Sequence, residues 1–188
     1  VALAGRTLPP SADATLAGLT TAEALRSHFI STQKGASPVE IERQVSSLLR
    51  AREVAQNLRA FEAMGCRVSY HAIDAADPQQ LSALMDTLYA EEGRIDAVFH
   101  GAGVIEDRLL EDKTEESFNR VFGTKVDTLL HLTASLRPET LKLFLLFSSV
   151  AGRFGNRGQS DYAAANEVLN RWANELARRW PQTRVLSV

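Results

Sequence analysis

The sequence predicts an α/β protein with a doubly wound parallel sheet, and two observations support this fold class. Five short apolar segments have the length of buried strands, and longer segments with helical periodicity lie between them. The apolar run at 141–147 suits a central parallel strand that is buried on both faces. Strands that alternate with helices pair in parallel, because each helix carries the chain back to the same end of the sheet.

The first expected strand is residues 1–4, and Gly5-Arg6-Thr7 forms the turn at its carboxyl end. The connection that follows, about 8–65, is long for one crossover between strands. Its first part, 8–18, is rich in Pro, Ala, Ser and Thr and is expected to be irregular. The mixture of charges further along predicts a solvated cover of the sheet and not a separate domain.

Two helices are expected within this connection. Residues 21–32 have the length of a short helix, which a glycine-containing turn separates from the next one. Ser37 is placed to cap the second helix, with Pro38 as its first residue. Apolar residues then recur at helical intervals as far as Met64, and Gly65 ends the helix.

The middle of the chain repeats the alternation of strands and helices. Residues 68–73 are expected to be a strand, and Asp77 caps the helix at 79–92. The next strand, 95–100, leads into the small-residue turn Gly101-Ala102-Gly103. This region therefore predicts a further strand–helix–strand unit of a parallel sheet.

The last third of the chain contains two long helices, expected at 114–136 and 161–180. The apolar run described above lies between them and ends in two serines and a loop punctuated by glycines. Ser160 and Asp161 offer side chains that can cap the final helix. Residues 184–188 form the fifth expected strand.

Three polar residues around this loop are expected to meet at one small site. Ser149 ends the fourth strand, and Tyr162 follows 13 residues later (162 − 149) in the first turn of the last helix. Asn166 lies one turn beyond Tyr162, on the same helical face. Open α/β sheets place their chemistry at the carboxyl ends of the strands, which is where these residues fall.

The segment SSVAGRFGNRGQSDYAAAN resembles the active-site segment of ketoreductase domains from polyketide synthases and polyunsaturated fatty acid synthases. These domains belong to the short-chain dehydrogenase/reductase superfamily, so the resemblance implies a Rossmann-like sheet. Simple members carry Tyr-x-x-x-Lys, whereas the synthase domains carry Tyr-x-x-x-Asn and place the lysine in an earlier helix. Tyr162 to Asn166 has the synthase form, and Lys125 lies in the preceding helix, 37 residues before Tyr162 (162 − 125).

The resemblance implies four catalytic residues, Lys125, Ser149, Tyr162 and Asn166. Tyr162 would supply the proton that ketone reduction requires, and the Lys125 ammonium would favour the tyrosinate form. Lys125 and Tyr162 would also bind the nicotinamide end of the cofactor. Ser149 would donate a hydrogen bond to the developing oxyanion, and Asn166 would position Lys125 and a proton-relay water. Without the resemblance, a lone lysine near an apolar face more often extends to solvent.

NADPH is the cofactor that the resemblance implies. Arg6 follows the first strand with no acidic residue before Asp13, which favours the 2′-phosphate of NADPH, although a solvated surface arginine is the alternative. Asp74 would bind the adenine, and its alternative is a turn aspartate. Gly101, Ala102 and Gly103 would let the backbone approach the cofactor, while His100 is expected to be structural and not a general base. The sequence contains no G-x-G-x-x-G turn for the pyrophosphate.

Two positions bear on the stereochemistry of the product. Ketoreductases that carry Leu-Asp-Asp after the small-residue turn form one group, and those with a tryptophan eight residues before the tyrosine form the other. Ile105-Glu106-Asp107 nearly matches the Leu-Asp-Asp motif of the first group. Phe154 stands at the tryptophan position of the second group but has no indole N–H to donate. We therefore expect Asp107 and Phe154 to face the substrate and the product to be the D-3-hydroxyacyl chain. A solvated acidic turn is the alternative for Glu106 and Asp107.

Composition indicates an ordinary globular domain over residues 1–188, with 45% hydrophobic and 23% charged residues. A formal charge of −2 favours binding to neither nucleic acid nor membrane, and no run reaches the roughly 18 apolar residues of a membrane span. The single cysteine, Cys66, excludes an internal disulfide and fits a reducing cytoplasm. No metal is expected.

Strands stand at both ends of the sequence, where surface elements are usual, so we expect a fragment truncated at both ends. The resemblance identifies this fragment as a ketoreductase catalytic subdomain of a multidomain synthase. Its partners would be other domains of the synthase and a 3-ketoacyl chain tethered to an acyl carrier protein. The alternatives are a non-catalytic structural ketoreductase subdomain and a free-standing reductase of a small ketone.

Overall fold

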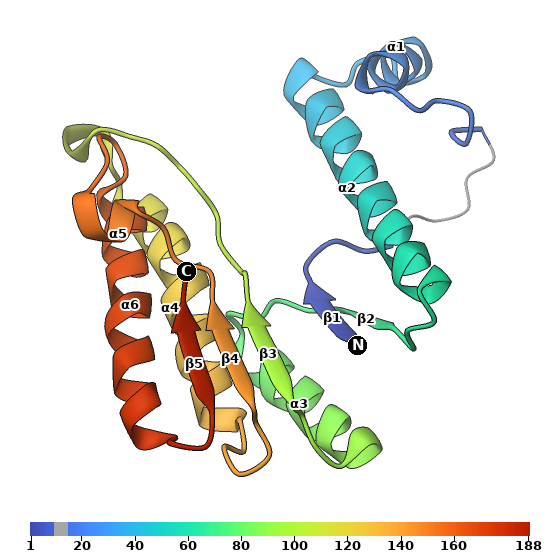
Figure 1. The fold of residues 1–188 in the computed structure, drawn as a ribbon. Helices are drawn as coiled ribbons and strands as arrows, with labels where there is room; N and C mark the ends of the chain where they lie inside the picture. Colours follow the sequence, from blue (N-terminus) through green and yellow to red (C-terminus); the bar gives the residue numbers. More distant parts are fainter. Residues whose placement is uncertain (10–14) are drawn as a thin grey trace. The chain divides into compact units, whose positions relative to one another are not determined.

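The structure, a computed structural model, describes residues 1–9 and 15–188. The chain divides into two compact units, Val1–Ala72 and Ile73–Val188, and both are drawn in Figure 1. This division differs from the single domain that composition indicates. Part of the irregular segment expected at 8–18, including Asp13, lies outside the described residues.

The first unit combines a two-stranded parallel sheet with two helices. β1 (Ala2–Gly5) pairs in parallel with β2 (Ser69–Ala72). The helices α1 (Ala22–Thr32) and α2 (Pro38–Ala63) lie in the connection between these strands. Both predicted helices are therefore confirmed to within one residue at each end.

Local sequence signals begin and end α2. The Ser37 hydroxyl accepts a hydrogen bond from the Glu40 N–H (3.3 Å), and the Glu40 carboxylate accepts one from the Ser37 N–H (2.8 Å). This reciprocal capping box satisfies two backbone donors at the start of the helix. Beyond Met64, Gly65 has a φ of +79°, which lies in the left-handed region that glycine adopts without strain.

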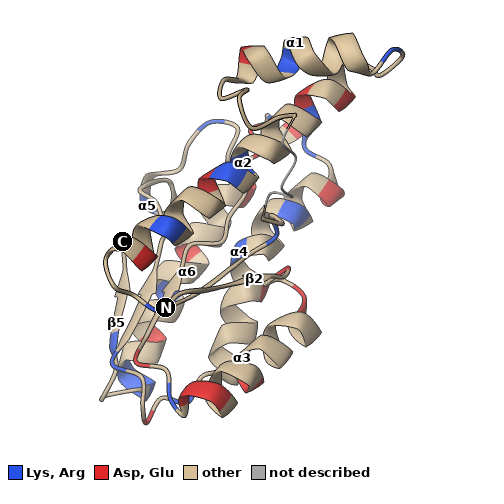
Figure 2. Cartoon of the chain, turned by 90° about the vertical axis from the view of Figure 1, so that its right-hand side faces the viewer, with Lys and Arg blue, Asp and Glu red and all other residues tan. Residues whose placement is uncertain are grey.

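A small buried core holds α1 and α2 together. Leu25 and Phe29 of α1 are buried with Ile41 and Val45 of α2. Each pair is spaced by four residues, which places its side chains on one face of its helix. The helical pair therefore has a core of its own, which the predicted solvated cover did not include. Charged residues of both signs alternate along α2, as Figure 2 shows.

The second unit is a three-stranded parallel sheet with helices packed on it. In chain order its elements are α3 (Pro78–Glu92), β3 (Ala97–His100), the 3₁₀ helix η1 (Leu110–Asp112), α4 (Glu115–Ser135), β4 (Leu143–Leu146), α5 (Ala151–Phe154), α6 (Ser160–Arg179) and β5 (Arg184–Ser187). The strand order is β3-β4-β5, so the apolar run forms the central strand, as predicted. Among these elements, η1 and α5 were not predicted.

The core of the second unit lies on one face of its sheet. Phe144 and Leu146 of β4 are fully buried among residues of α3, α4 and α6. Figure 1 shows these three helices on the same side of the strands. Leu143 and Leu145 are partly buried, because successive side chains of a strand point to opposite faces. Within this unit the predicted burial of β4 is thus confirmed for one face only.

The helix caps of this unit agree with the prediction at α3 and differ at α6. Asp77 caps α3, and its Oδ1 accepts hydrogen bonds from two N–H groups of the first turn (2.8 and 3.1 Å). At α6 the N-cap residue is Gln159, and no side chain makes a capping hydrogen bond. The predicted cap by Ser160 or Asp161 is therefore wrong, since both residues already belong to the first turn and Asp161 is paired with Lys113.

Candidate active site

The ammonium of Lys125 and the ring of Tyr162 lie side by side in the second unit. Lys125 comes from the middle of α4 and Tyr162 from the first turn of α6. The Lys125 Nζ is 5.5 Å from the centre of the Tyr162 ring and donates a hydrogen bond to the Phe147 carbonyl (2.7 Å). The structure therefore brings together α4, α6 and the carboxyl end of β4 at one point.

Two neighbours fix the position of Lys125. The ring of His100, at the end of β3, lies 2.9 Å from the Lys125 carbonyl oxygen through its Nε2. A Cβ added at Gly103 would lie 3.1 Å from the Lys125 Cε, so the glycine leaves room for the lysine side chain. Lys125 is 4% exposed, and this burial lowers the pKa of the ammonium.

His100 occupies the structural position that the sequence predicts. It is 2% exposed, and its ring contacts the backbone of α4. Burial lowers the pKa of its imidazole and outweighs the hydrogen bond to the Lys125 carbonyl, which acts to raise it. The ring contact with the Lys125 carbonyl stabilises the backbone that carries Lys125.

Ser149 stands where β4 gives way to α5. Its hydroxyl accepts a hydrogen bond from the Ala151 N–H (3.1 Å), and its carbonyl accepts one from the Gly152 N–H (3.0 Å). A Cβ at Gly152 would lie 2.9 Å from the Glu167 nitrogen in α6. Because backbone atoms cannot move aside cheaply, glycine is required there for α5 to approach α6.

Asn166 is fully buried and contacts the backbone of Tyr162. Its Nδ2 donates to the Tyr162 carbonyl (2.7 Å), and its own carbonyl accepts from the Ser148 hydroxyl (3.1 Å). The Oδ1 of Asn166 has no hydrogen-bond partner among the described residues. The predicted contact was with Lys125, whereas the amide nitrogen holds the helix turn that carries Tyr162.

The other residues predicted to bind the cofactor lie at several places. Arg6 is exposed after β1 in the first unit. Asp74 follows β2, and its Oδ1 accepts a hydrogen bond from the Ala76 N–H (3.0 Å), as a turn aspartate does. Gly101 follows β3, where an added Cβ would make only an ordinary contact with Phe147, at 3.5 Å.

The two residues predicted to face the substrate differ in their surroundings. The carboxylate of Asp107 accepts hydrogen bonds from the Gln159 Nε2 (2.9 and 3.2 Å). The Arg108 N–H donates to the Gly158 carbonyl (2.9 Å), so this loop is bound to the loop before α6. Phe154, the last residue of α5, is 83% exposed.

Sequence reasoning missed a set of buried or paired charges near the start of α6. Lys113 and Asp161 form an ion pair at 2.7 Å, with side chains that are 2% and 1% exposed. Glu106 accepts hydrogen bonds from Arg120 and from the Ser117 hydroxyl. These bonds lower the pKa of Glu106 to about 2, mainly through Arg120. The sequence drew attention to Asp161, but its place at the start of a helix suggested a cap and not an ion pair.

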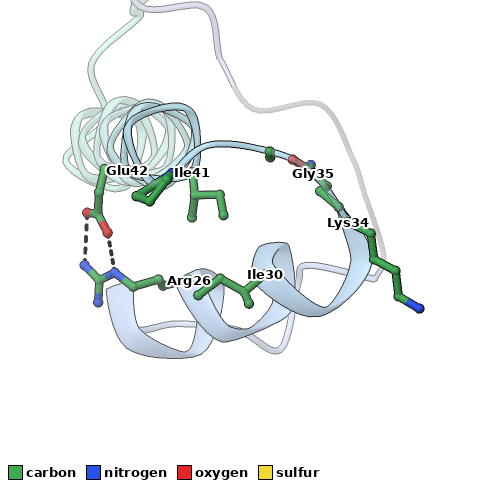
Figure 3. Close-up of a pocket in the computed structure, with 9 residues that line it drawn as sticks. Arg26, Ile30, Lys34, Gly35, Ile41 and Glu42 are labelled. Atoms are coloured by element: carbon green, nitrogen blue, oxygen red, sulfur yellow. Dashed lines mark hydrogen bonds and ion pairs between the residues drawn. The ribbon is translucent and has the colours of Figure 1, made fainter.

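A separate hollow of about 370 Å³ lies in the first unit between α1, α2 and the turn that joins them. Figure 3 shows Arg26 of α1 reaching Glu42 of α2 across its rim, with Ile30 and Ile41 on its walls. None of the residues predicted for the site lines this hollow. It is a feature of the helical pair and not of the Lys125–Tyr162 site.

Two kinds of feature are missing from the described part of the chain. No helix there is long and apolar enough to cross a membrane. No group of three or more His, Cys, Asp or Glu side chains is placed there to hold a metal ion.

A family model described as the KR domain matches residues 31–188, which is more than half of the chain. The chain belongs to the KR domain family. KR domains are ketoreductases of the short-chain dehydrogenase/reductase superfamily, whose members are oxidoreductases that bind nicotinamide cofactors. The predicted family and the Rossmann-like α/β fold class are thus confirmed.

Similar proteins include two large synthases. A polyunsaturated fatty acid synthase chain from Thraustochytrium sp. is 40% identical over 142 residues, which cover 75% of this chain and 5% of that protein. Polyketide synthase PksL from Bacillus subtilis is 34% identical over 134 residues, which cover 68% of this chain and 3% of that protein. The KR domain chain thus spans only a small part of each synthase.

A solved structure has the same fold. An N-terminal ketoreductase from the macrolactin assembly line matches 72% of this chain and 28% of its own, with a TM-score of 0.69 and 31% sequence identity. At this identity the likeness supports both the fold and the family.

Proposed function

We propose that this KR domain reduces the ketone of a 3-ketoacyl thioester to the 3-hydroxyacyl thioester with NADPH. The acyl chain would be tethered to an acyl carrier protein, within a cytoplasmic multidomain polyketide or polyunsaturated fatty acid synthase. The observation that carries the proposal is the buried Lys125 ammonium, 5.5 Å from the centre of the Tyr162 ring. A non-catalytic copy of the fold gains nothing from this ammonium, because burying a charge costs stability.

The residues of the site have separate tasks in this reaction, which adds a hydride to the ketone carbon and a proton to its oxygen. The Tyr162 hydroxyl gives the proton, and the Lys125 ammonium stabilises the negative charge left on the phenolate. Ser149 donates a hydrogen bond to the oxygen as its charge develops. Asn166 holds the Tyr162 carbonyl, and so keeps the first turn of α6 in place.

The surroundings of Lys125 fit the nicotinamide end of NADPH. The Phe147 carbonyl takes one of the three ammonium donors, and the others can bind ribose hydroxyls. Gly103 leaves room for the Lys125 side chain, and so supports its placement for this contact. Bound NADPH supplies the hydride. Arg6 would bind the 2′-phosphate and Asp74 the adenine; these two assignments rest on their positions after β1 and β2.

The product of this reduction would be the D-3-hydroxyacyl chain. Asp107 is held by Gln159 in the loop that leads into α6, a position from which it can limit the side of substrate entry. Phe154 offers an apolar surface without a hydrogen-bond donor. Both features support the group of ketoreductases that carry Leu-Asp-Asp after the small-residue turn. Residues 105–107, which stand at that position here, are called the acidic loop below.

Replacing Tyr162 with Phe tests the proposal, because it removes the transferable proton and keeps the ring. In the full-length protein, turnover of a short 3-ketoacyl thioester should fall roughly 10²–10⁴-fold, while NADPH binding measured by fluorescence stays nearly intact. Tyr89→Phe is the control for stability, since it removes a buried hydroxyl of α3 that accepts a hydrogen bond from the Arg137 N–H (2.9 Å) and contacts neither Lys125 nor Tyr162, and it should keep full turnover.

Wild-type turnover in Tyr162→Phe would overturn the role of Tyr162 as the proton donor. An equal loss in both variants would instead assign the effect to stability. Chiral chromatography of the wild-type product tests the stereochemistry, which an excess of the L-3-hydroxy product would contradict.

A further inference from the structure

The pair Lys113–Asp161 lies at the start of the helix that carries Tyr162. Asp161 is the second residue of α6, and Lys113 directly precedes the residue that caps α4. The Lys113 Nζ lies 2.7 Å from the Asp161 Oδ2, and both side chains are nearly inaccessible to solvent. The two residues are 48 positions apart in the sequence, so the pair joins two separate segments.

Each member of the pair makes a second hydrogen bond that extends the connection. The other carboxylate oxygen of Asp161 accepts from the Tyr162 N–H (2.8 Å). Lys113 also donates to the Glu106 carbonyl (3.0 Å). A continuous chain of bonds therefore runs from the loop before η1, through two buried charges, to the backbone of Tyr162.

Neighbouring contacts bind the same two segments side by side. Asp107 accepts from Gln159, and the Arg108 N–H donates to the Gly158 carbonyl. Figure 1 shows the segment between β3 and α4 passing the end of the unit where α5 lies. The buried Lys113–Asp161 pair is therefore one of several contacts that bind the acidic loop to the start of α6.

The energetics of buried ion pairs indicate why this one matters for geometry. Two apolar side chains of similar volume would generally stabilise such a place as well or better, because the charges lose their hydration. The ion pair instead supplies directional hydrogen bonds, because the Lys113 ammonium only donates and the Asp161 carboxylate only accepts. In addition, Lys113 neutralises a carboxylate that stands one residue from Tyr162.

We infer that Lys113 and Asp161 are positioning residues for ketone reduction, which hold Tyr162 at a fixed position relative to the acidic loop. This inference rests on the proposed function, because it presumes that Tyr162 gives the proton. Neither residue touches the reacting atoms, so their removal should lower kcat and leave KM for the thioester and the affinity for NADPH nearly unchanged.

Two variants of the full-length protein separate positioning from stability. Lys113→Met leaves the Asp161 charge buried alone, and should lower both the thermal midpoint and kcat, the latter by up to about 10²-fold, the loss expected for a misplacement near 1 Å. Lys113→Met combined with Asp161→Asn removes both charges. The double variant should recover the thermal midpoint, because no lone charge remains, while kcat stays low, because methionine cannot bridge the two segments.

Arg171→Met is the matched control, since it breaks an exposed ion pair with Glu167 on the same helix. It should leave both kcat and the thermal midpoint unchanged. Recovery of kcat together with the thermal midpoint in the double variant would overturn the inference, as would unchanged kcat in Lys113→Met. Tyr162→Phe, assayed in parallel, separates failure of the proposed function from failure of this inference. Full turnover in that variant refutes the proposed function and this inference with it.

Discussion

The two units of the chain differ in whether they bury charged side chains: both carry ion pairs at the surface, and the second also buries charges. In the first unit, Arg26 and Glu42 pair at the surface, above a small apolar core formed by α1 and α2. In the second unit, Lys113 and Asp161 pair inside the protein, and Lys125 is buried beside Tyr162. Surface pairs contribute little to stability, whereas buried charges are costly and need a compensating task. Under the proposed function, this difference fits a reaction site in the second unit.

The hydrophobic cores of the two units differ in how many elements they join. The core of the first unit joins residues of two helices and a few neighbours. The core of the second unit extends through α3, α4, β4 and α6. A rigid layer of this kind can hold polar groups at fixed distances, as a catalytic site requires.

The largest effect should come from matched cavities in the two cores. Leu25 and Leu129 are both fully buried, in α1 and α4 respectively. Leu129→Ala should lower the free energy of unfolding by about 4–5 kcal/mol, and Leu25→Ala by about 2–3 kcal/mol, because the smaller core can collapse around the gap. Denaturant unfolding with hydrogen exchange of each unit measures both values. Equal losses would contradict the contrast between the cores.

Arg6→Ala tests whether the first unit contributes to cofactor choice. Loss of a charge-assisted contact with the 2′-phosphate should weaken NADPH binding roughly 10- to 150-fold. NADH lacks this phosphate, so its affinity should barely change. Titration of both cofactors, followed by fluorescence, gives the ratio. Equal weakening of NADPH and NADH would show that Arg6 does not read the phosphate.

A smaller effect is expected from two glycines that follow β3. An added Cβ at Gly103 would press on the Lys125 side chain at 3.1 Å, whereas one at Gly101 would make an ordinary contact. Gly103→Ala should therefore slow ketone reduction, by less than the roughly 10²-fold of a 1 Å misplacement. Gly101→Ala should leave the rate unchanged. The prediction fails if the two variants show the same rate.

The smallest effect concerns stability in acid. The pKa of Glu106 falls from its ordinary value near 4.5 to about 2 in the folded protein. Ionised Glu106 therefore stabilises the fold fully above about pH 4.5, and this stabilisation is lost as the pH falls toward 2. Glu106→Gln should lower the thermal midpoint at pH 7, and the difference from wild type should vanish near pH 2. Glu42→Gln, in the surface pair of the first unit, should show a weaker version of this trend. A difference that persists at pH 2 would assign the loss to packing.

The elements of the fold could be predicted because each carries a local signal. Periodicity located α2 and α4, and Asp77 marked the start of α3. The elements η1 and α5 are too short to show a period. The buried core between α1 and α2 was missed because it arises from two helices together and not from either alone.

The site could be predicted only in part. The pairing of Lys125 with Tyr162 followed from the resemblance to a family and not from any local pattern, and the structure brings the two residues together. The Lys113–Asp161 pair gave no such signal, because its members are 48 positions apart. Asp161 alone looked like a helix cap, and Lys113 belongs to no local motif.

The hydrogen bond from Lys125 to the Phe147 carbonyl makes that carbonyl a spectroscopic reporter. An amide C=O bonded to an ammonium vibrates at a lower frequency than one bonded to an N–H, because the stronger, charge-assisted bond lengthens it. Isotope labelling of the single Phe147 carbonyl would shift its infrared band away from the rest of the backbone. Its frequency would then register, in real time, each departure of the lysine from the end of β4.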